Sequence, residues 1–284
     1  MLVSICTPTY NRRPFIPGII ECVQRQTHKN FEWVIVDDGS DPIEDLVTHL
    51  PFVKYVKLSE RVPLGKKRNI MHQHAKGDIL VYMDDDDFYP ATRVAHAVER
   101  LEANPGIMVA GSSAMHIYFH HIQKIVLFGP YGKWHATAGT FAFRKELLQG
   151  AGYNDDDMMG EEKAFLKNYT IPLVQLDPKH SILVFTHDYN TFDKRTLLDN
   201  PEKTIMQYTD LKVADFIPDA TQAHFYTTLQ DQLKKFDARN SIVVNGRTLK
   251  GGEIVQFVSQ QQAYIRHLEQ KVKELKKGGS DLSV

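Results

Sequence analysis

Cysteine is scarce in this sequence, where only Cys6 and Cys22 occur among 284 residues. Cys6 lies in an apolar run and Cys22 in a predicted helix, so the pair supplies neither a disulfide framework nor the ligand spacing of a zinc ribbon. We therefore expect a fold that rests on an apolar core in a reducing compartment. The hydrophobic content of 42% is sufficient for such a core.

An excess of charge of one sign is also absent. Lysine and arginine together number 34, and aspartate and glutamate 35, which leaves a formal net charge of −1. No global positive field is available to hold nucleic acid or an anionic membrane, so neither is an expected partner. An anionic ligand must instead be bound by a local group of residues.

Long apolar runs and two familiar nucleotide-binding motifs are missing as well. No run approaches the ~18 to 20 apolar residues of a membrane span, and the N-terminus lacks the layout of a signal peptide. We expect a cytoplasmic protein without a transmembrane segment. The sequence has no GxGxxG, and residues 60–67 are not a Walker loop because glycine is absent at 60 and Lys67 occupies the hydroxyl position. These absences weaken an assignment as a dinucleotide-dependent oxidoreductase.

Strand-like apolar runs alternate with helix-like segments through the first 105 residues. This alternation predicts an α/β fold with a mostly parallel sheet and helices on both faces. The first, second and fourth of the strand candidates are apolar on both sides, which is typical of an internal sheet. The expected strands are 2–7, 31–37, 53–58 and 78–83, and the expected helices are 14–26, 42–50, 63–74 and 91–103.

After residues 104–106 the pattern favours longer strands with fewer helices between them, which predicts an antiparallel or mixed extension of the sheet. Residues 1–200 would form this first domain, and residues 201–284 a helical C-terminal extension. The expected strands are 107–119, 124–128, 139–143, 171–176 and 181–186, and the expected helices 161–168, 219–236 and 252–277.

The last predicted helix, residues 252–277, carries a short heptad seam. Its seam positions recur at alternating steps of three and four, as in a coiled coil. They are Val258, Gln261, Ile265, Leu268, Val272 and Leu275. Roughly three heptads are few for a free-standing coiled coil. Homo-oligomerisation through this helix and packing on its own domain are therefore equal alternatives.

Polar clusters follow three of the predicted parallel strands, at residues 7–11, 37–40 and 84–87. Ligands of an open parallel sheet bind outside the carboxyl ends of its strands, so we expect these clusters to form one site. A carboxylate in 37–40 can accept hydrogen bonds from a ribose or base, and a helix-capping turn is the alternative. Residues 65–69 add positive charge that suits the base or phosphates of a nucleotide.

The run Asp84–Asp87 is the most informative feature. In an extended segment, residues i and i+2 point the same way, so Asp84 and Asp86 would face one point. Oxygen ligands favour Mg²⁺ or Mn²⁺ over zinc, and phosphate oxygens can complete the shell. A solvated acidic turn is the alternative, which the preceding apolar strand disfavours. An EF-hand is excluded because Tyr89 and Ala95 occupy its glycine and glutamate positions.

Taken in order, these motifs resemble the nucleotide-sugar-binding half of a family 2 type glycosyltransferase with the GT-A fold. The resemblance spans about residues 1–200 and rests on residues 6–12, 33–40, 65–69 and 77–87. It implies a nucleoside diphosphate-sugar donor, with a UDP-sugar expected, and transfer to a hydroxyl of a glycan or other acceptor. It also implies Mn²⁺ or Mg²⁺ at a DxD motif.

The resemblance further assigns individual residues. Asp84 and Asp86 match the metal-binding DxD, with the register open by one, and His187 is a candidate third ligand or else a surface histidine. The implied donor contacts are Thr7, Pro8, Thr9, Tyr10, Asp38, Arg68, Asp84 and Asp85.

Residues 159–162 resemble the family's Gly-Glu-Asp segment, which carries the general base of inverting members. Glu162 stands where aspartate is usual, so we expect Glu162 as the base and Glu161 as an acceptor contact, or the reverse. The alternative is that Glu161 and Glu162 have no catalytic role and are acidic residues in a first helical turn, where the helix dipole favours negative charge. A retaining transferase is the close alternative mechanism.

Aromatic residues in a glycine-rich loop precede the predicted strand 139–143. Aromatic faces stack on sugars, so Trp134 and His135 are expected to contact the acceptor, although Trp134 could equally be a core residue. A sugar-phosphate nucleotidyltransferase would need a glycine-rich basic loop after the first strand, which residues 7–13 do not form. A non-catalytic sugar-binding protein is the remaining alternative.

Overall fold

A computed structural model describes residues 1–157, 160–199, 202, 204–237, 241–244 and 247–250, together with residues 253, 254, 257, 260, 261, 264, 265, 267, 268, 271 and 272. The strands are β1 (Val3–Thr9), β2 (Phe31–Asp37), β3 (Val53–Lys57), β4 (Ile79–Tyr82), β5 (Val109–Gly111), β6 (Met115–Phe119), β7 (Lys124–Phe128), β8 (Ala142–Arg144), β9 (Leu173–Gln175), β10 (Leu183–Phe185), β11 (Met206–Tyr208), β12 (Ser241–Val244) and β13 (Arg247–Lys250). The helices are α1 (Ile16–Gln24), α2 (Glu44–Val47), α3 (Leu64–His74), α4 (Arg93–Glu102), α5 (Glu162–Phe165), α6 (Pro178–Ser181), α7 (Ala220–Thr227) and α8 (Leu229–Asp237).

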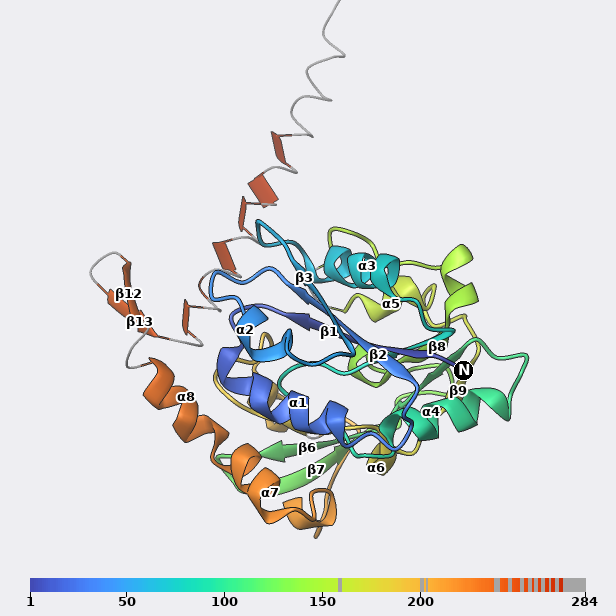
Figure 1. Ribbon diagram of the computed structural model, residues 1–284. Helices are drawn as coiled ribbons and strands as arrows, with labels where there is room; N and C mark the ends of the chain where they lie inside the picture. The colour runs from blue at the N-terminus through green and yellow to red at the C-terminus, as the bar shows by residue number, and fades with distance from the viewer. Residues whose placement is uncertain are drawn as a thin grey trace, which may run out of the picture.

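The main sheet confirms the predicted α/β architecture. Its strand order is β3-β2-β1-β4-β8-β5-β9, and the first four strands are parallel. β8 runs antiparallel to both β4 and β5, so the sheet is mixed beyond β4. Figure 1 shows α3 and α5 over one face of this sheet and α1 and α4 over the other.

Alternate side chains of the central strands enter two separate apolar cores. Ile5 and Trp33 pack into the core that contains α1 and α4, whereas Cys6 and Val34 pack into the core that contains α3 and α5. This division follows from the period of two in a strand. Because both faces are covered, the carboxyl ends of the parallel strands are the part of the sheet open to a ligand.

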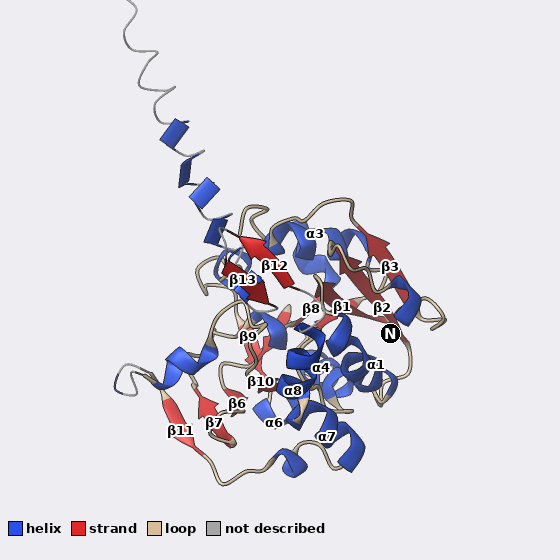
Figure 2. Ribbon diagram, turned by 90° about the vertical axis from the view of Figure 1, so that its left-hand side faces the viewer, coloured by secondary structure: helices blue, strands red, loops and turns tan. Residues whose placement is uncertain are grey.

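A second sheet, with strand order β10-β6-β7-β11, lies beside the main one (Figure 2). The single strand expected over 107–119 is in fact two strands, β5 and β6, which belong to different sheets. The chain turns between them, where the Ser112 hydroxyl donates to the Ala114 carbonyl at 2.6 Å. Such a local side-chain bond competes with strand pairing and lets the chain change sheets.

Residues that follow the predicted domain boundary at 200 pack on the same body. β11 pairs antiparallel with β7, although no strand is expected there from the sequence. Tyr226 of α7 is buried, and its hydroxyl donates to the carbonyl of Asp87 at 3.1 Å. The division at 200 into separately folding units stays a prediction.

The predicted seam helix is described only in part. Gln261, Ile265, Leu268 and Val272 are helical, and the last three are 51%, 41% and 48% exposed. Val258 and Leu275 lie outside the described residues. Among the residues that the structure describes, no helix is both long and apolar enough to cross a membrane.

Candidate active site

A cavity of about 550 Å³ opens at the carboxyl ends of β1 and β4. It joins segments that are far apart in the sequence and brings most of the predicted site residues together. Its lining residues include Pro8, Thr9, Tyr10, Arg12, Arg61, Lys67, Arg68, Asp84, Asp85, Asp86, Asp87, Glu161, Phe192 and Lys194. Two of the three polar clusters, those that follow β1 and β4, thus line one cavity, and no residue of 37–40 is among its lining residues.

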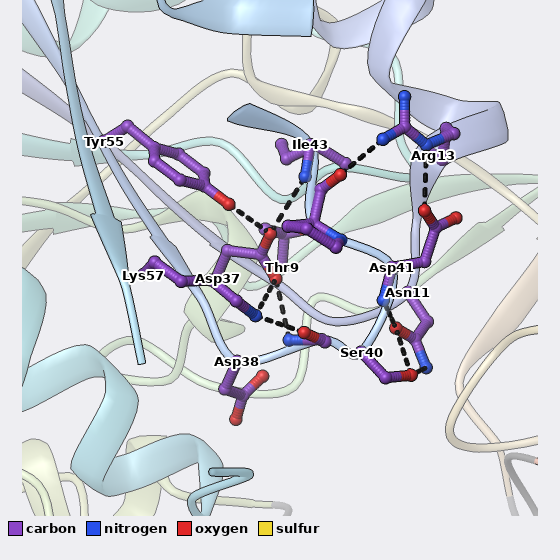
Figure 3. Close-up of polar contacts among 12 residues, drawn as sticks. Thr9, Asn11, Arg13, Asp37, Asp38, Ser40, Asp41, Ile43, Tyr55 and Lys57 are labelled. Atoms are coloured by element: carbon purple, nitrogen blue, oxygen red, sulfur yellow. Dashed lines mark hydrogen bonds and ion pairs between the residues drawn. The ribbon is translucent and has the colours of Figure 1, made fainter. Parts of the chain in front are cut away.

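The two aspartates that end β2 have different surroundings. Asp37 accepts hydrogen bonds from the backbone N–H groups of Gly39 and Ile43 and from the Tyr55 hydroxyl, at 2.7, 3.2 and 2.6 Å (Figure 3). This carboxylate therefore holds the turn that leads to α2. Asp38 points away from this cluster.

Asp38 is paired with a lysine of α3. Its Oδ1 accepts from Lys67 Nζ, and its Oδ2 accepts from the Val62 N–H at 2.8 Å. The Asp38 side chain has no exposed surface, while that of Lys67 is 7% exposed and lines the cavity. The residue predicted to contact the donor at this place lies behind the cavity wall.

The aspartates after β4 do not alternate as an extended segment would. Asp85 and Asp86 form a turn, and both approach the Arg12 guanidinium, at 3.8 and 3.6 Å. Asp84 turns instead toward Arg68, with 3.6 Å between Oδ1 and an Arg68 nitrogen. The strand ends at Tyr82, so the run is not an extended segment, and the expectation that Asp84 and Asp86 face a common point stays a prediction.

Asp86 is the aspartate closest to His187, with 3.2 Å between Oδ2 and Nε2. Burial alone would raise the pKa of Asp86, but the Arg12 guanidinium and the His187 hydrogen bond outweigh burial and hold that pKa well below its usual range. Burial lowers the pKa of His187 to about 4, so this imidazole is neutral at neutral pH. The Tyr189 N–H donates to its Nδ1, and its Nε2 lies between Asp86 Oδ2 and the side-chain nitrogen of Asn190, which is 2.9 Å away.

Asp85 and Asp87, the remaining aspartates of the run, also have different surroundings. Burial raises the pKa of Asp85 to about 7 despite the nearby Arg12. Asp87 accepts from the Phe185 N–H at 3.1 Å and so ties the turn to β10, which is a structural role.

A divalent cation is compatible with the donor atoms at this edge. One carboxylate oxygen of Asp84 and one of Asp85 are buried without a hydrogen-bond partner among the described residues. A cation would satisfy such oxygens, and Asp86 with His187 adds a mixed oxygen and nitrogen pair. Within the described ranges, no three carboxylate, imidazole or thiol side chains lie close enough together to bind one metal ion by themselves. Phosphate or water oxygens would therefore have to complete the shell.

Arg68 of α3 connects the aspartate turn to the predicted catalytic glutamates. Its guanidinium is 3% exposed, stacks 4.5 Å from the Tyr82 ring centroid, and donates from Nε to Glu161 Oε1 at 2.9 Å. The side chain also lies beside Asp84. Arg68 is predicted to contact the nucleotide-sugar donor. The structure adds that it orients Glu161 in the cavity wall.

Glu161 and Glu162 are not equivalent. Glu161 lines the cavity and is almost completely buried, whereas Glu162 begins α5, is half-buried and is not among the lining residues. Burial raises the pKa of Glu162, an effect strengthened by the charge of Glu161. No ion pair to Glu162 is seen among the described side chains. The Glu162 carboxylate therefore holds a proton more readily than a fully solvated glutamate does.

The segment after β1 supplies both structural and cavity residues. Thr7 accepts from Trp33 Nε1 at 2.8 Å and donates to the Met83 carbonyl at 2.6 Å, so its hydroxyl is used inside the sheet. The geometry does not support its predicted contact with the donor. Pro8, Thr9 and Tyr10 do line the cavity, as predicted.

The aromatic loop lies outside the cavity wall. Trp134 is 40% exposed, which argues against a core role, and the His135 ring lies 5.2 Å from Tyr131 and 5.1 Å from Tyr169. Tyr131 and Trp134 are exposed, whereas His135 and Tyr169 are half-buried. Two residues further along, Thr137 begins the part of this loop that does line the cavity.

Four basic residues at the cavity have no individual role in the sequence prediction: Arg12, Arg61, Lys67 and Lys194. Arg12 directly follows the motif at the end of β1, and Lys67 directly precedes Arg68, so both could have been suspected. Nothing in the local sequence around Arg61 or Lys194 indicates a site. Arg61 stacks on Tyr10, with its guanidinium carbon 4.2 Å from the ring centroid.

Comparison with known proteins agrees with this geometry. Among curated relatives, an uncharacterised glycosyltransferase of Haemophilus influenzae is 32% identical over 109 residues, which are 37% of this chain and 36% of the relative. The Escherichia coli UDP-Glc:alpha-D-GlcNAc-diphosphoundecaprenol beta-1,3-glucosyltransferase WfaP is 29% identical over 104 residues, 36% of this chain and 41% of the relative. The matches thus span less than half the length of these two proteins.

Two solved structures share the fold. Staphylococcus aureus TarS superposes with a TM-score of 0.51 at 18% identity, over 76% of this chain and 43% of that one. The mannosyltransferase PcManGT from Pyrobaculum calidifontis, in complex with GDP-Man and Mn²⁺, gives a TM-score of 0.51 at 17% identity, over 93% and 79%. The expected GT-A type fold is confirmed by these likenesses.

The sequence profile described as glycosyl transferase family 2 matches residues 4–163. This stretch holds β1 through β8, the aspartate turn and the two glutamates at the start of α5. With more than half of its length matched, the chain belongs to glycosyl transferase family 2.

Proposed function

We propose that this protein transfers a sugar from a nucleoside diphosphate-sugar, with UDP-sugars as the first candidates, to a hydroxyl group of a glycan or other acceptor. The observation that carries the proposal is a single cavity that joins Tyr10, the Asp84–Asp87 turn, Arg68 and Glu161. An aromatic platform, cation-binding oxygens and a glutamate are the groups that base binding, diphosphate departure and acceptor activation require.

The donor would lie along the cavity from Tyr10 toward the aspartate turn. An aromatic face such as that of Tyr10 suits a stacked base, and the cationic side chains of Arg12 and Lys194 on the cavity wall suit a diphosphate. The cavity volume of about 550 Å³ is in the range of small-molecule sites. The name of WfaP gives UDP-Glc as its donor, which supports UDP-sugars as first candidates.

A divalent metal fits the proposal. Asp86, His187 and the oxygens of Asp84 and Asp85 that lack a hydrogen bond among the described residues would hold Mn²⁺ or Mg²⁺. When bound, the ion would supply charge stabilisation for the departing diphosphate. The structural neighbour PcManGT was solved in complex with Mn²⁺, which supports this assignment.

Glu162 is the proposed base of an inverting displacement. A donor that fills the cavity leaves the acceptor to enter at its rim, where Glu162 follows the lining residue Glu161. Glu162 would take the proton of the attacking hydroxyl, and Glu161, fixed by Arg68, would orient the acceptor. The exposed ring of Trp134 and the half-buried ring of His135 are proposed to stack on acceptor sugars.

A nucleotide-sugar panel tests the proposed function. Purified protein with Mn²⁺ and a mixture of glycan acceptors is expected to release nucleoside diphosphate from one nucleotide sugar well above the others. Removal of the metal by EDTA should stop the release, and added Mn²⁺ should restore it. Proton NMR of the product then decides between inversion and retention at the anomeric carbon. Absence of release from every donor, with and without acceptors, would contradict the proposal.

We also propose that the seam of residues 258–275 joins two copies of the chain. Ile265, Leu268 and Val272 are exposed in the single chain, and pairing would remove this apolar surface from water. Light scattering should then give a dimer for the full chain and a monomer for a chain truncated after residue 250. A full-length monomer at micromolar concentration would refute the dimer.

A further inference from the structure

Asp86 and His187, the proposed metal ligands, lie on two loops that are far apart in the sequence. Asp86 is in the turn after β4, and His187 is in the loop after β10. Their side chains approach to 3.2 Å between Oδ2 and Nε2. Because neither residue is part of a helix or a strand, this distance depends on the side chains that hold the two loops.

Tyr226 of α7 contacts both of these segments. Its hydroxyl donates to the carbonyl of Asp87, the residue after Asp86, at 3.1 Å. Its ring stacks on that of Phe185, which shortly precedes His187, with 4.9 Å between the ring centroids. One buried side chain from the C-terminal part of the chain thus lies between the two segments that carry the proposed ligands.

The packing of α7 against α1 fixes the place of Tyr226. The Cys22 sulfur lies 3.4 Å from the Tyr226 hydroxyl oxygen. The two helices are so close at Gly18 that a Cβ atom at this position would lie 3.0 Å from the same oxygen. The hydroxyl is therefore enclosed, and its removal would leave the buried carbonyl of Asp87 without this donor.

The first turn of α8 holds the loop of His187. Gln230 accepts from the Asp188 N–H at 3.2 Å and donates to the Asp188 carboxylate. Leu229, the preceding residue, packs in a buried cluster with Phe15. The Phe15 ring in turn lies 4.7 Å from the His187 imidazole, between centroids. The backbone next to His187 and one side of its ring are thus both supported from α8.

We propose that Tyr226 and Gln230 are positioning residues that set the distance between Asp86 and His187, and thereby the affinity of the site for a divalent cation. This inference rests on the proposed function, because it takes these two side chains as metal ligands. Replacement of residues that orient metal ligands commonly lowers metal affinity by about 10- to 100-fold. Both positions lie outside residues 4–163, the stretch that the family profile matches.

Calorimetry of Mn²⁺ binding to the full chain in the presence of UDP tests the inference. Tyr226→Phe removes one hydroxyl and keeps the ring on Phe185, so the affinity for Mn²⁺ should fall about 10-fold. Gln230→Ala should cause a similar loss. The Mn²⁺ concentration for half-maximal turnover should rise by the same factor, while turnover at saturating Mn²⁺ stays within about threefold of the wild type. A protein that is merely less stable would lose turnover and keep its Mn²⁺ affinity.

Hydrogen exchange of the metal-free protein gives a second measurement that needs no activity. Backbone amides of residues 84–88 should exchange about threefold faster or more in Tyr226→Phe, and those of residues 187–190 in Gln230→Ala, because each loop loses a hydrogen bond that holds it. If Tyr226→Phe fails to fold, Gln230→Ala decides, since it changes a half-buried residue.

Tyr208→Phe and Gln207→Ala are the matched controls, because both residues are exposed on β11, and they should keep the wild-type Mn²⁺ affinity. Unchanged affinity in Tyr226→Phe and Gln230→Ala, with a wild-type protein that does bind Mn²⁺, would overturn the inference and leave the proposed function intact. A loss in only one of the two variants would overturn the role of the other residue. A wild-type protein that binds no Mn²⁺ would overturn the proposed metal site, and the inference with it.

Discussion

Replacement of Asp86 by asparagine is expected to lower the rate of sugar transfer by about 10² to 10³-fold, with the fold intact. Asp86 lies 3.2 Å from His187 and 3.6 Å from Arg12, so it is the carboxylate that links the proposed metal ligand to the positive wall of the cavity. Asparagine keeps the shape but removes the charge that a divalent cation needs. The expected size corresponds to the loss of several kcal/mol of charge stabilisation on the leaving diphosphate.

The measurement is nucleoside diphosphate release across a Mn²⁺ titration, together with calorimetry of Mn²⁺ binding in the presence of UDP. Asp78→Asn is the control, because Asp78 is an exposed aspartate just before β4, at the opposite end of that strand from the site. This control should keep the wild-type rate and metal affinity. A folded Asp86→Asn protein with wild-type, EDTA-sensitive activity would show that the metal is held elsewhere.

Glu162→Gln is expected to reduce turnover by roughly 10²-fold or more while donor affinity stays within about threefold of the wild type. Glutamine preserves shape and removes basicity. A general base matters to transfer far more than to donor binding, because its bond to the acceptor proton strengthens only as the hydroxyl attacks. Calorimetry with UDP and initial rates at saturating donor separate the two effects.

Glu161→Gln provides the matched comparison and should behave differently. Glu161 is the ion-pair partner of Arg68, which lines the donor cavity and also lies beside Asp84. Loss of that charge should therefore weaken donor binding as well as turnover. If Glu161→Gln leaves donor affinity unchanged and Glu162→Gln transfers sugar at the wild-type rate, Glu161 is the base. If both variants are fully active, the base lies elsewhere or the enzyme retains configuration.

Arg68 explains why these two predictions are connected. It is buried, it stacks on Tyr82, and it separates the carboxylates of Asp84 and Glu161, which would otherwise repel each other. The donor side and the acceptor side of the proposed reaction thus share one cation. Removal of the charge of Asp84 or of Glu161 therefore changes the electrostatic environment of the other carboxylate.

The parallel half of the fold could be predicted because its signal is local. β1, β2 and β4 are apolar runs of the right length, and their burial on both faces follows from that composition. β3 alternates with two lysines and is only partly buried, as suits the edge of the sheet. β11 could not be predicted, since Gln207 and Tyr208 are exposed and the strand exists only through its pairing with β7. The turn at 112–114 was missed because it interrupts an otherwise continuous strand-like run.

The sequence by itself predicted that the polar ends of three parallel strands meet at one edge of the sheet, because parallel strands bring their carboxyl ends together. The two glutamates were added to that predicted site by the family resemblance alone. Only the tertiary structure decided which of these groups reach the cavity. Lys67 covers Asp38 from 29 positions along the chain, and Arg68 holds Glu161 from 93 positions away. Such pairings depend on how α3 and the start of α5 pack over the sheet. Local composition does not indicate which residues far apart in the sequence will meet.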